Sequence, residues 1–258
     1  MSTQPAPRNP FKAAMAALEL RYGLWLGLGS PYTAEIAAGA GFDWLLIDNE
    51  HAPNDLRSTL GQLQAIAGYG SHPVVRVPVG DVALIKQMLD IGAQTLLVPM
   101  VDTPEQAAQM VAATRYPPAG IRGVGGGITR AARWNRRPHY LQEANDEVCL
   151  LVQVETVTAI DNLDAIVAID GIDGIFFGPA DLSASMGLLG QPAHPRVRSL
   201  IGESMRRVRA AGKAPGIICA DSELAKYYID CGACFVALGV DAAILSGALD
   251  TLVRRWKA

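Results

Sequence analysis

The sequence predicts an α/β chain folded as a (β/α)8 barrel, the TIM-barrel architecture. Short runs rich in Val, Ile and Leu recur eight times, and stretches with helical patterning separate them. Nearly continuous apolar runs are typical of parallel strands covered on both faces. Eight such units in 258 residues match the usual size of this barrel. A doubly wound sheet is the alternative, but GLWLGLGSPY lacks the G-x-G-x-x-G spacing expected after its first strand.

Each predicted strand is an apolar run bounded by polar or turn residues. In chain order the runs are GLWLGL (23–28), DWLLID (43–48), PVVRVP (73–78), TLLVPM (95–100), CLLVQVE (149–155), GIFFGP (174–179), APGIIC (214–219) and CFVALG (234–239). A polar, Pro-rich tail is expected at 1–10, followed by a single barrel domain over 11–258.

Each predicted helix combines helical periodicity with a start or stop signal. The predicted helices are 33–41, 55–68, 81–92, 103–115, 158–169, 194–212 and 222–232. The expected N-caps are Thr33, Asp55, Asp81, Thr103 and Ser222, and the expected stops are Gly39, Gly92, Gly212 and Gly232. The segment 115–147 is too long for a simple connection, and we predict that it is an active-site loop after the fourth strand.

Composition excludes several classes of protein. The formal net charge of −3 does not favour nucleic-acid or membrane-surface binding, because both usually require a basic excess. No apolar run approaches the roughly 18 residues that span a bilayer, and the first residues do not resemble a signal peptide. The cysteines at 149, 219, 231 and 234 lie mostly in apolar segments, as buried thiols do. We therefore expect a cytoplasmic protein that binds neither membrane nor nucleic acid.

Ionisable side chains gather where the predicted strands end, and barrel active sites lie at these carboxyl ends. The residues at these exits are Asp48, Glu50 and His51 after the second strand, Arg76 on the third, Gln153 and Glu155 on the fifth, and Ala180 and Asp181 after the sixth. We therefore expect these side chains to meet in one cleft.

Several of these residues admit two interpretations. Glu155 and Asp181 can bind Mg²⁺ or Mn²⁺ together with water and substrate oxygens, or can cap the helices that follow them. Arg76, within an apolar strand, needs an anion, either a substrate group or a structural ion-pair partner. His51 is a general base or an ordinary loop histidine. The arginine-rich run 122–137 is a solvated loop or a lining for an anionic substrate, rather than an RNA site.

Eight motifs also resemble, in the same order, one family of enzymes. They are LLIDNEHAPND, PVVRVP, TLLVPMV, RYPPAGIRGVG, RWNRRPHYLQEAND, LVQVET, GPADLSASMG and GKAPGI. Together they resemble the class II, metal-dependent pyruvate aldolases, and most of all those of aromatic catabolism that cleave 4-hydroxy-2-oxoheptane-1,7-dioate. The resemblance runs from about Phe11 to the last predicted strand and implies a barrel of the phosphoenolpyruvate/pyruvate type.

The resemblance implies roles for most of the strand-exit residues and assigns none to Glu50. Glu155 and Asp181 would bind a divalent cation (Mg²⁺, Mn²⁺ or Co²⁺). Gln153 and the backbone of Ala180 and Asp181 would hold the pyruvoyl part of the substrate. His51 would be the general base, and Arg76 would stabilise the transition state. Trp25 and Ile218, at the exits of the first and seventh strands, are expected to form the wall that tunes aldehyde preference.

The resemblance also implies that Asp90 raises the basicity of the catalytic histidine. Asp90 lies at the end of the helix before the fourth strand, on the face opposite the expected mouth, so it can hardly reach His51 of its own subunit. A neighbouring subunit can supply it, and the family likeness suggests a homo-oligomer, specifically a hexamer, with the C-terminal segment packed on a neighbour. Asp48 is the intrachain alternative for orienting His51.

The reaction implied is reversible cleavage of a 4-hydroxy-2-oxo acid to pyruvate and an aldehyde, succinate semialdehyde for the heptanedioate. Asn49, where the family often has glycine, and the GGGIT sequence of the long segment depart from the pattern and leave the aldehyde open. A 2-keto-3-deoxy sugar-acid aldolase of the same family and a non-catalytic binding barrel are the alternatives.

Overall fold

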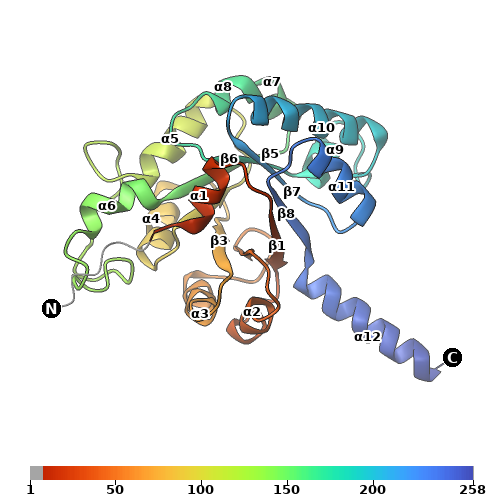
Figure 1. Cartoon of the computed structure of the whole chain (residues 1–258), viewed down its shortest axis with the longest axis horizontal. Coiled ribbons are helices and arrows are strands. Elements are labelled where there is room, and N and C mark those ends of the chain that lie inside the picture. The colour runs from red at the N-terminus through yellow and green to blue at the C-terminus, as the bar shows by residue number, and fades with distance from the viewer. Residues whose placement is uncertain (1–7, 258) are drawn as a thin grey trace.

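The computed structural model describes residues 8–257 and shows a closed barrel of eight parallel strands (Figure 1). Each strand pairs with the next in chain order, and β8 closes the barrel on β1. The strands are β1 Arg21–Leu26, β2 Trp44–Asp48, β3 His72–Arg76, β4 Thr95–Val98, β5 Cys149–Val154, β6 Gly174–Phe177, β7 Ala214–Ile218 and β8 Phe235–Val240. Every predicted strand is present within about two residues of its predicted ends, so the (β/α)8 prediction is confirmed.

Two apolar layers hold the barrel together. The interior is filled by aromatic side chains, among them Trp44, Phe176 and Phe235. Glycines make room for them: a side chain at Gly23 would collide with the Trp44 ring, and one at Gly216 with the Phe235 ring. A second cluster lies between the outer faces of the strands and the helices. Both faces of the strands are therefore buried, which explains why the strands read as continuous apolar runs.

The helices follow the predicted order, with additions. Their bounds are α1 Pro10–Ala16, α2 Pro31–Ala38, α3 Leu56–Ile66, α4 Val82–Asp90, α5 Pro104–Thr114, α6 Tyr140–Glu147, α7 Val157–Asp161, α8 Leu163–Val167, α9 Pro179–Ser185, α10 Pro195–Ala210, α11 Ser222–Asp230 and α12 Asp241–Lys257. Asp55, Asp81 and Thr103 are N-caps as predicted. Thr33 and Ser222 are not, because the caps are Ser30, before a proline, and Asp221.

The prediction that 115–147 is an active-site loop of its own barrel is wrong. The segment follows α5 and leads into β5, so it lies at the amino-terminal end of the strands, opposite the mouth. It includes α6 and a small apolar cluster centred on Tyr116 and Tyr140. Loops at the mouth follow strands, and the predicted helix 103–115 already separated this segment from the fourth strand.

Helix α1 closes the amino-terminal end of the barrel. Phe11 stacks on His72, with ring centroids 5.6 Å apart, and packs edge-on against Trp44 and Phe235. Asn9 caps the helix and donates to Thr95 Oγ1 at 3.0 Å. The predicted tail therefore meets α1 at its last residues, while residues 1–7 lie outside the described part of the chain.

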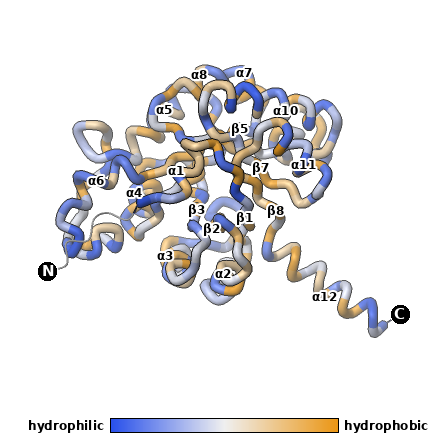
Figure 2. The backbone as a smooth tube through the Cα atoms, viewed as in Figure 1, coloured by the Kyte–Doolittle hydropathy of each residue, from blue (hydrophilic) through white to orange (hydrophobic). Residues whose placement is uncertain are grey.

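Helix α12 extends away from the barrel without packing on it over most of its length (Figures 1 and 2). Its side chains are exposed, including the large apolar residues Ile244, Leu245, Leu249, Leu252, Val253 and Trp256. Within residues 8–257, no helix is both long enough and apolar enough to cross a membrane.

Candidate active site

A pocket of about 470 Å³ opens at the carboxyl ends of the strands. Eight of the residues singled out from the sequence line it: Trp25, Asp48, His51, Arg76, Gln153, Ala180, Asp181 and Ile218. They come from β1, β2 and the loop after it, β3, β5, β7 and the start of α9, far apart in the sequence. Six of the eight strand-exit residues therefore line one pocket, while Glu50 and Glu155 are not among its lining residues. The chemical role of each residue stays a prediction.

Arg76 is held by Asp48 through two parallel hydrogen bonds. Its Nε donates to Asp48 Oδ1 at 2.8 Å and its Nη2 donates to Asp48 Oδ2 at 2.6 Å. The guanidinium also lies 4.8 Å from the centre of the Trp25 ring, and Trp25 Nε1 donates to Asp48 Oδ2 at 3.1 Å. Burial alone would raise the pKa of Asp48, but the hydrogen bonds and charge of Arg76 outweigh it and hold that pKa below its usual value. Asp48 is therefore an anion, as a partner for Arg76 must be.

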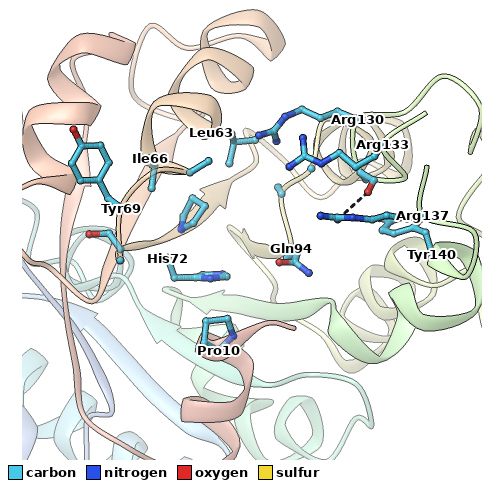
Figure 3. A pocket seen from close by; sticks show the side chains of 17 residues that line it. Pro10, Leu63, Ile66, Tyr69, His72, Gln94, Arg130, Arg133, Arg137 and Tyr140 are labelled. Atoms are coloured by element: carbon cyan, nitrogen blue, oxygen red, sulfur yellow. Dashed lines mark hydrogen bonds between the residues drawn. The ribbon is translucent and has the colours of Figure 1, made fainter. Parts of the chain in front are cut away.

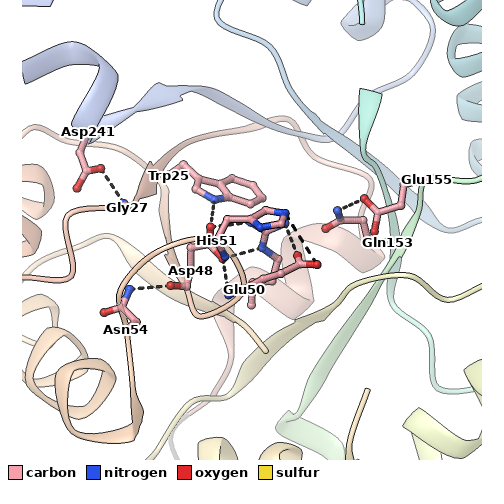
Figure 4. A network of polar contacts seen from close by, with 10 residues as sticks. Trp25, Gly27, Asp48, Glu50, His51, Asn54, Gln153, Glu155 and Asp241 are labelled. Atoms are coloured by element: carbon pink, nitrogen blue, oxygen red, sulfur yellow. Dashed lines mark hydrogen bonds and ion pairs between the residues drawn. The ribbon is translucent and has the colours of Figure 1, made fainter. Parts of the chain in front are cut away.

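Glu50 contacts both Arg76 and His51, and Figure 4 shows its side chain beside that of His51. Its Oε2 is 2.7 Å from Arg76 Nη1, a close ion pair without hydrogen-bond alignment, and its Oε1 is 4.0 Å from His51 Nε2. Burial raises the pKa of Glu50, and the charges of Arg76 and His51 oppose that rise.

The imidazole of His51 is mostly exposed at the mouth, with 68% of its side-chain surface accessible. Asp48 does not orient this ring directly. Its Oδ1 accepts from the backbone N–H groups of Glu50 and His51, at 2.9 and 3.4 Å, and so fixes the turn that carries the histidine. The side-chain partner of the ring among the described residues is Glu50.

On the other side of the pocket, Glu155 is almost completely buried. Its Oε1 accepts from the backbone N–H of Met100 at 2.9 Å, and its Oε2 accepts from Gln153 Nε2. Burial raises the pKa of Glu155 to about 7, and the nearby charges of Asp181 and Glu50 add to the rise while the two hydrogen bonds oppose it. A carboxylate in this environment is stabilised by a cation.

The donor set on this side suits a hard divalent cation. Gln153 Oε1 is buried without a hydrogen-bond partner, so a second oxygen beside Glu155 is unpaired. Gly178 leaves the space open, since a Cβ there would stand 2.9 Å from Glu155 Cβ and 3.1 Å from Gln153 Nε2. Across the described residues no cluster of three or more His, Cys, Asp or Glu side chains is found. Two carboxylates with water and substrate oxygens are nevertheless enough to bind Mg²⁺ or Mn²⁺.

Asp90 lies outside this pocket, at the end of α4 on the amino-terminal side of the barrel. Its Oδ1 accepts from Arg122 Nη2 at 2.9 Å, and the fully buried Arg122 also stacks over Tyr116, 4.3 Å from the ring centre. The structure therefore agrees that Asp90 cannot contact His51 of its own chain. A contribution from a neighbouring subunit stays a prediction.

Sequence reasoning missed two contributors to the mouth. Asp241, the first residue of α12, accepts from the backbone N–H groups of Gly27 and Leu28 at 2.7 and 3.3 Å and fixes the exit of β1. Met100, which donates to Glu155, has a positive φ of 54°. An acidic residue opening the last helix was the available signal for Asp241. No sequence signal marks a methionine in the left-handed region.

Comparisons with known proteins give a consistent result. A family model described as HpcH/HpaI aldolase/citrate lyase matches residues 21–248. A hydroxypyruvate/pyruvate aldolase of Deinococcus radiodurans is 63% identical over 249 residues, covering 96% of this chain and 90% of the relative. A 4-hydroxy-2-oxo-heptane-1,7-dioate aldolase of Escherichia coli is 57% identical over 250 residues, covering 97% and 95%. A crystal structure of an HpcH/HpaI aldolase/citrate lyase family protein from Burkholderia cenocepacia superposes with a TM-score of 0.93 at 42% identity, covering 97% of this chain and all of that one.

Proposed function

The chain belongs to the HpcH/HpaI aldolase/citrate lyase family and is an aldolase, a lyase of carbon–carbon bonds; we propose that it is a divalent-metal-dependent enzyme that reversibly cleaves 4-hydroxy-2-oxo acids to pyruvate and an aldehyde. The observation that carries the proposal is the meeting of His51, Arg76 and Asp181 in one pocket, with Glu155 behind Gln153 on its wall.

Retro-aldol cleavage of such an acid breaks the C3–C4 bond and leaves an electron pair on C3, which the 2-oxo group must accept. A divalent cation bound by Glu155 and Asp181 would supply the Lewis acid that stabilises the negative charge on the 2-oxo oxygen. Gln153, Ala180 and Asp181 would hold the pyruvoyl part, because the backbone at the start of α9 offers N–H donors to a carboxylate. Gly178 keeps this region open to the substrate.

Arg76 would place a fixed positive charge beside the same oxygen. Two of its N–H groups are taken by Asp48, so the orientation of the guanidinium is set before substrate binds. The Nη1 group remains for the substrate, since its contact with Glu50 is an ion pair without hydrogen-bond alignment. Preorganised charge of this kind needs no rearrangement during the reaction.

His51 would remove the proton from the 4-hydroxyl group and return it in the condensation direction. Its exposed position at the mouth is where the aldehyde half of a substrate would lie if the pyruvoyl half were held near Gln153 and Asp181. Glu50, 4.0 Å from its Nε2, is placed to stabilise the protonated imidazole.

Imine chemistry is the competing mechanism for an aldolase, and it requires a lysine at the site. The five lysines lie at 12, 86, 213, 226 and 257, and the described residues that line the active-site pocket include none of them. Lys12 and Lys213 instead donate to backbone carbonyls, at Asp146 and Ile172. This favours the metal-dependent mechanism.

For the substrate we propose 4-hydroxy-2-oxoheptane-1,7-dioate, with succinate semialdehyde as the released aldehyde. The Escherichia coli relative named for that reaction supports it. The name of the Deinococcus radiodurans relative favours a second candidate, in which hydroxypyruvate replaces pyruvate as the nucleophile. A 2-keto-3-deoxy sugar acid is the third. Trp25 and Ile218, with Phe176 and Val240 beside them, form the apolar wall that would choose among the aldehydes.

We further propose that the protein is a homo-oligomer, specifically a hexamer, in the cytoplasm. The exposed apolar side chains of α12 support association with another copy, because large apolar patches on a surface usually mark an interface. Free thiols at all four cysteines support a reducing compartment.

Pyruvate release, coupled to lactate dehydrogenase and measured over a panel of aldol donors, tests the proposal. EDTA should abolish activity, and Mn²⁺, Co²⁺ or Mg²⁺ should restore it. The donor panel includes the heptanedioate and sugar acids, and condensation assays compare pyruvate with hydroxypyruvate. Borohydride trapping of a pyruvate adduct on the protein would contradict the metal-dependent mechanism, and inactivity on every donor would favour a non-catalytic barrel.

A further inference from the structure

A second pocket, of about 320 Å³, lies at the amino-terminal end of the barrel, opposite the active-site mouth (Figure 3). One side is formed by the start of β3 and the turn before β4, including His72 and Gln94. The facing wall belongs to residues 130–137, and Pro10 of α1 lies below. The two pockets share no lining residue.

Three arginines of the 130–137 segment line this pocket: Arg130, Arg133 and Arg137. Figure 3 shows their side chains together on one wall, across from His72. Arg130 Nη1 donates to the carbonyl of Ile91 at 2.9 Å, and Arg137 Nη1 donates to the carbonyl of Ala131 at 3.4 Å. These partners are neutral, and Arg137 Nε is buried without a hydrogen-bond partner. The hydrogen bonds therefore hold two of the side chains without neutralising their charge.

The chain supplies no carboxylate to this pocket within its described part. None of the described lining residues is Asp or Glu. Burial and the positive charges of Arg133 and Arg137 lower the pKa of Arg130, and burial and Arg133 lower that of Arg137. The arginines thus repel one another across a shared space.

The backbone that carries the arginines is strained. Arg133, Trp134 and Asn135 have positive φ angles of 49°, 52° and 64°. A left-handed conformation costs roughly 1–2 kcal/mol per non-glycine residue. Such strain persists where the surrounding structure imposes it and is concentrated at functional sites. Here it accompanies a cluster of like charges, whose mutual repulsion a bound anion would reduce.

We propose that this pocket binds a small oxyanion carrying at least two negative charges, such as inorganic phosphate or a di- or tricarboxylate. The planar guanidinium group matches carboxylate and phosphate oxygens in paired hydrogen bonds. Three such groups can surround one small anion, and the volume lies at the lower end of the range for small-molecule sites. The inference rests on the charges of this pocket alone and is independent of the aldolase reaction.

The test uses the full chain, dialysed against EDTA so that no bound cation can attract anions to the active-site mouth. Isothermal titration with sodium phosphate and, separately, with citrate is compared with sodium chloride at matched ionic strength. We expect saturable binding of phosphate or citrate and none of chloride. The ratio of the two affinities identifies which oxyanion chemistry the pocket prefers.

Variants then locate the site. R133Q/R137Q should weaken binding at least about tenfold, since one hydrogen bond to a charged group contributes about 1.5–3 kcal/mol. R136Q is the matched control, because Arg136 lies in the same segment and stacks over Trp134 but does not line the pocket. It removes one positive charge and should change affinity less than twofold. R137Q alone serves if circular dichroism shows that the double variant is not folded.

Two results would overturn the proposal. Absence of saturable binding would mean that the pocket is not an anion site in the assembled protein, as when a carboxylate of another copy fills it. Equal binding by the wild type and R137Q or R133Q/R137Q, or an equal loss in R136Q, would place the anion elsewhere. Protection of residues 130–140 from hydrogen exchange on adding phosphate is expected in the wild type and not in R137Q.

Discussion

Asp48 and Arg76 stand side by side at the carboxyl ends of β2 and β3, where the register pairs them directly. Two hydrogen bonds of 2.8 and 2.6 Å join the carboxylate to the guanidinium, and both side chains are about 95% buried or more. This pair fixes the orientation of the Arg76 guanidinium in the pocket.

The geometry of this pair makes R76K a severe substitution. Lysine keeps the charge but cannot form the paired hydrogen bonds, so we expect kcat/KM to fall about 100-fold or more. R76A would leave the buried Asp48 carboxylate without its cationic partner and lower the free energy of unfolding by about 3–5 kcal/mol. Steady-state kinetics and urea unfolding measure the two effects. R57K and R57A, at an exposed arginine, are the controls, and R76K kinetics within twofold of wild type would contradict the assigned role.

Glu155 and Asp181 should each be needed for metal binding. E155Q and D181N keep size and remove charge, so we expect binding of Mn²⁺, followed by calorimetry, to weaken at least about tenfold in each. Metal-dependent pyruvate release should fall with it. E203Q, at an exposed position on α10, is the matched control. Unchanged Mn²⁺ affinity in both variants would place the cation elsewhere.

Asp90 is predicted to support His51 of a neighbouring subunit, and mixed oligomers test this directly. H51A and D90N, expressed together, should show more activity than either alone, because some interfaces then combine an intact histidine with an intact aspartate. H51A expressed with R76K is the control, since both residues belong to one pocket and mixing cannot restore it.

D90N by itself should also shift the pH profile of activity. If D90N leaves both activity and pH profile unchanged, the inter-subunit role of Asp90 is lost. D90N also removes the carboxylate that pairs with buried Arg122, so its unfolding free energy must be measured alongside.

His72 makes stability depend on pH. Burial lowers its pKa from 6.5 to about 4, so between these values the unfolded chain takes up a proton that the folded chain refuses. Its contribution to stability is therefore full above pH 6.5 and is lost as pH falls toward 4. H72Q, which can still bond Thr95 Oγ1, should flatten the pH dependence of the unfolding free energy over this range. H139Q, at an exposed histidine, should leave this pH dependence unchanged. Parallel curves of unfolding free energy against pH for the wild type and H72Q would contradict the role of His72.

Helix α12 is expected to mediate assembly through its apolar side chains. Leu245, Leu249 and Val253 recur at helical spacing, and all three are about half exposed. L249E/V253E should reduce the mass measured by light scattering toward that of one 27.3 kDa chain, because buried charge without a partner destabilises an interface. T251E, about 200° around the helix from Leu249, is the control. An unchanged mass in L249E/V253E would exclude this helix from the interface.

Most of the fold could be predicted from the sequence because the signals for strands and helices lie within short stretches of the chain. A buried strand needs a run of apolar residues whatever its partners are, so all eight runs became strands. The first residues of the helices were harder to predict than the strands. Thr33 and Ser222 are residue types that favour the N-cap position, but both lie inside the helices that they were expected to begin. The length of segment 115–147 is typical of an active-site loop, but the segment follows a helix and leads into a strand, so it lies at the opposite end of the barrel.

The sequence by itself determined the barrel, the order of its strands and the residues that exit at its mouth, because apolar periodicity and chain order fix these. Tertiary structure decided the rest. Only the register of β2 against β3 pairs Arg76 with Asp48, and only the packing of the mouth brings Glu50 into contact with both Arg76 and His51. The grouping of Arg130, Arg133 and Arg137 in the second pocket likewise depends on where residues 130–137 pack. Such contacts join residues distant in the chain, and side-chain reach across strands and loops is set by three-dimensional packing rather than by local pattern.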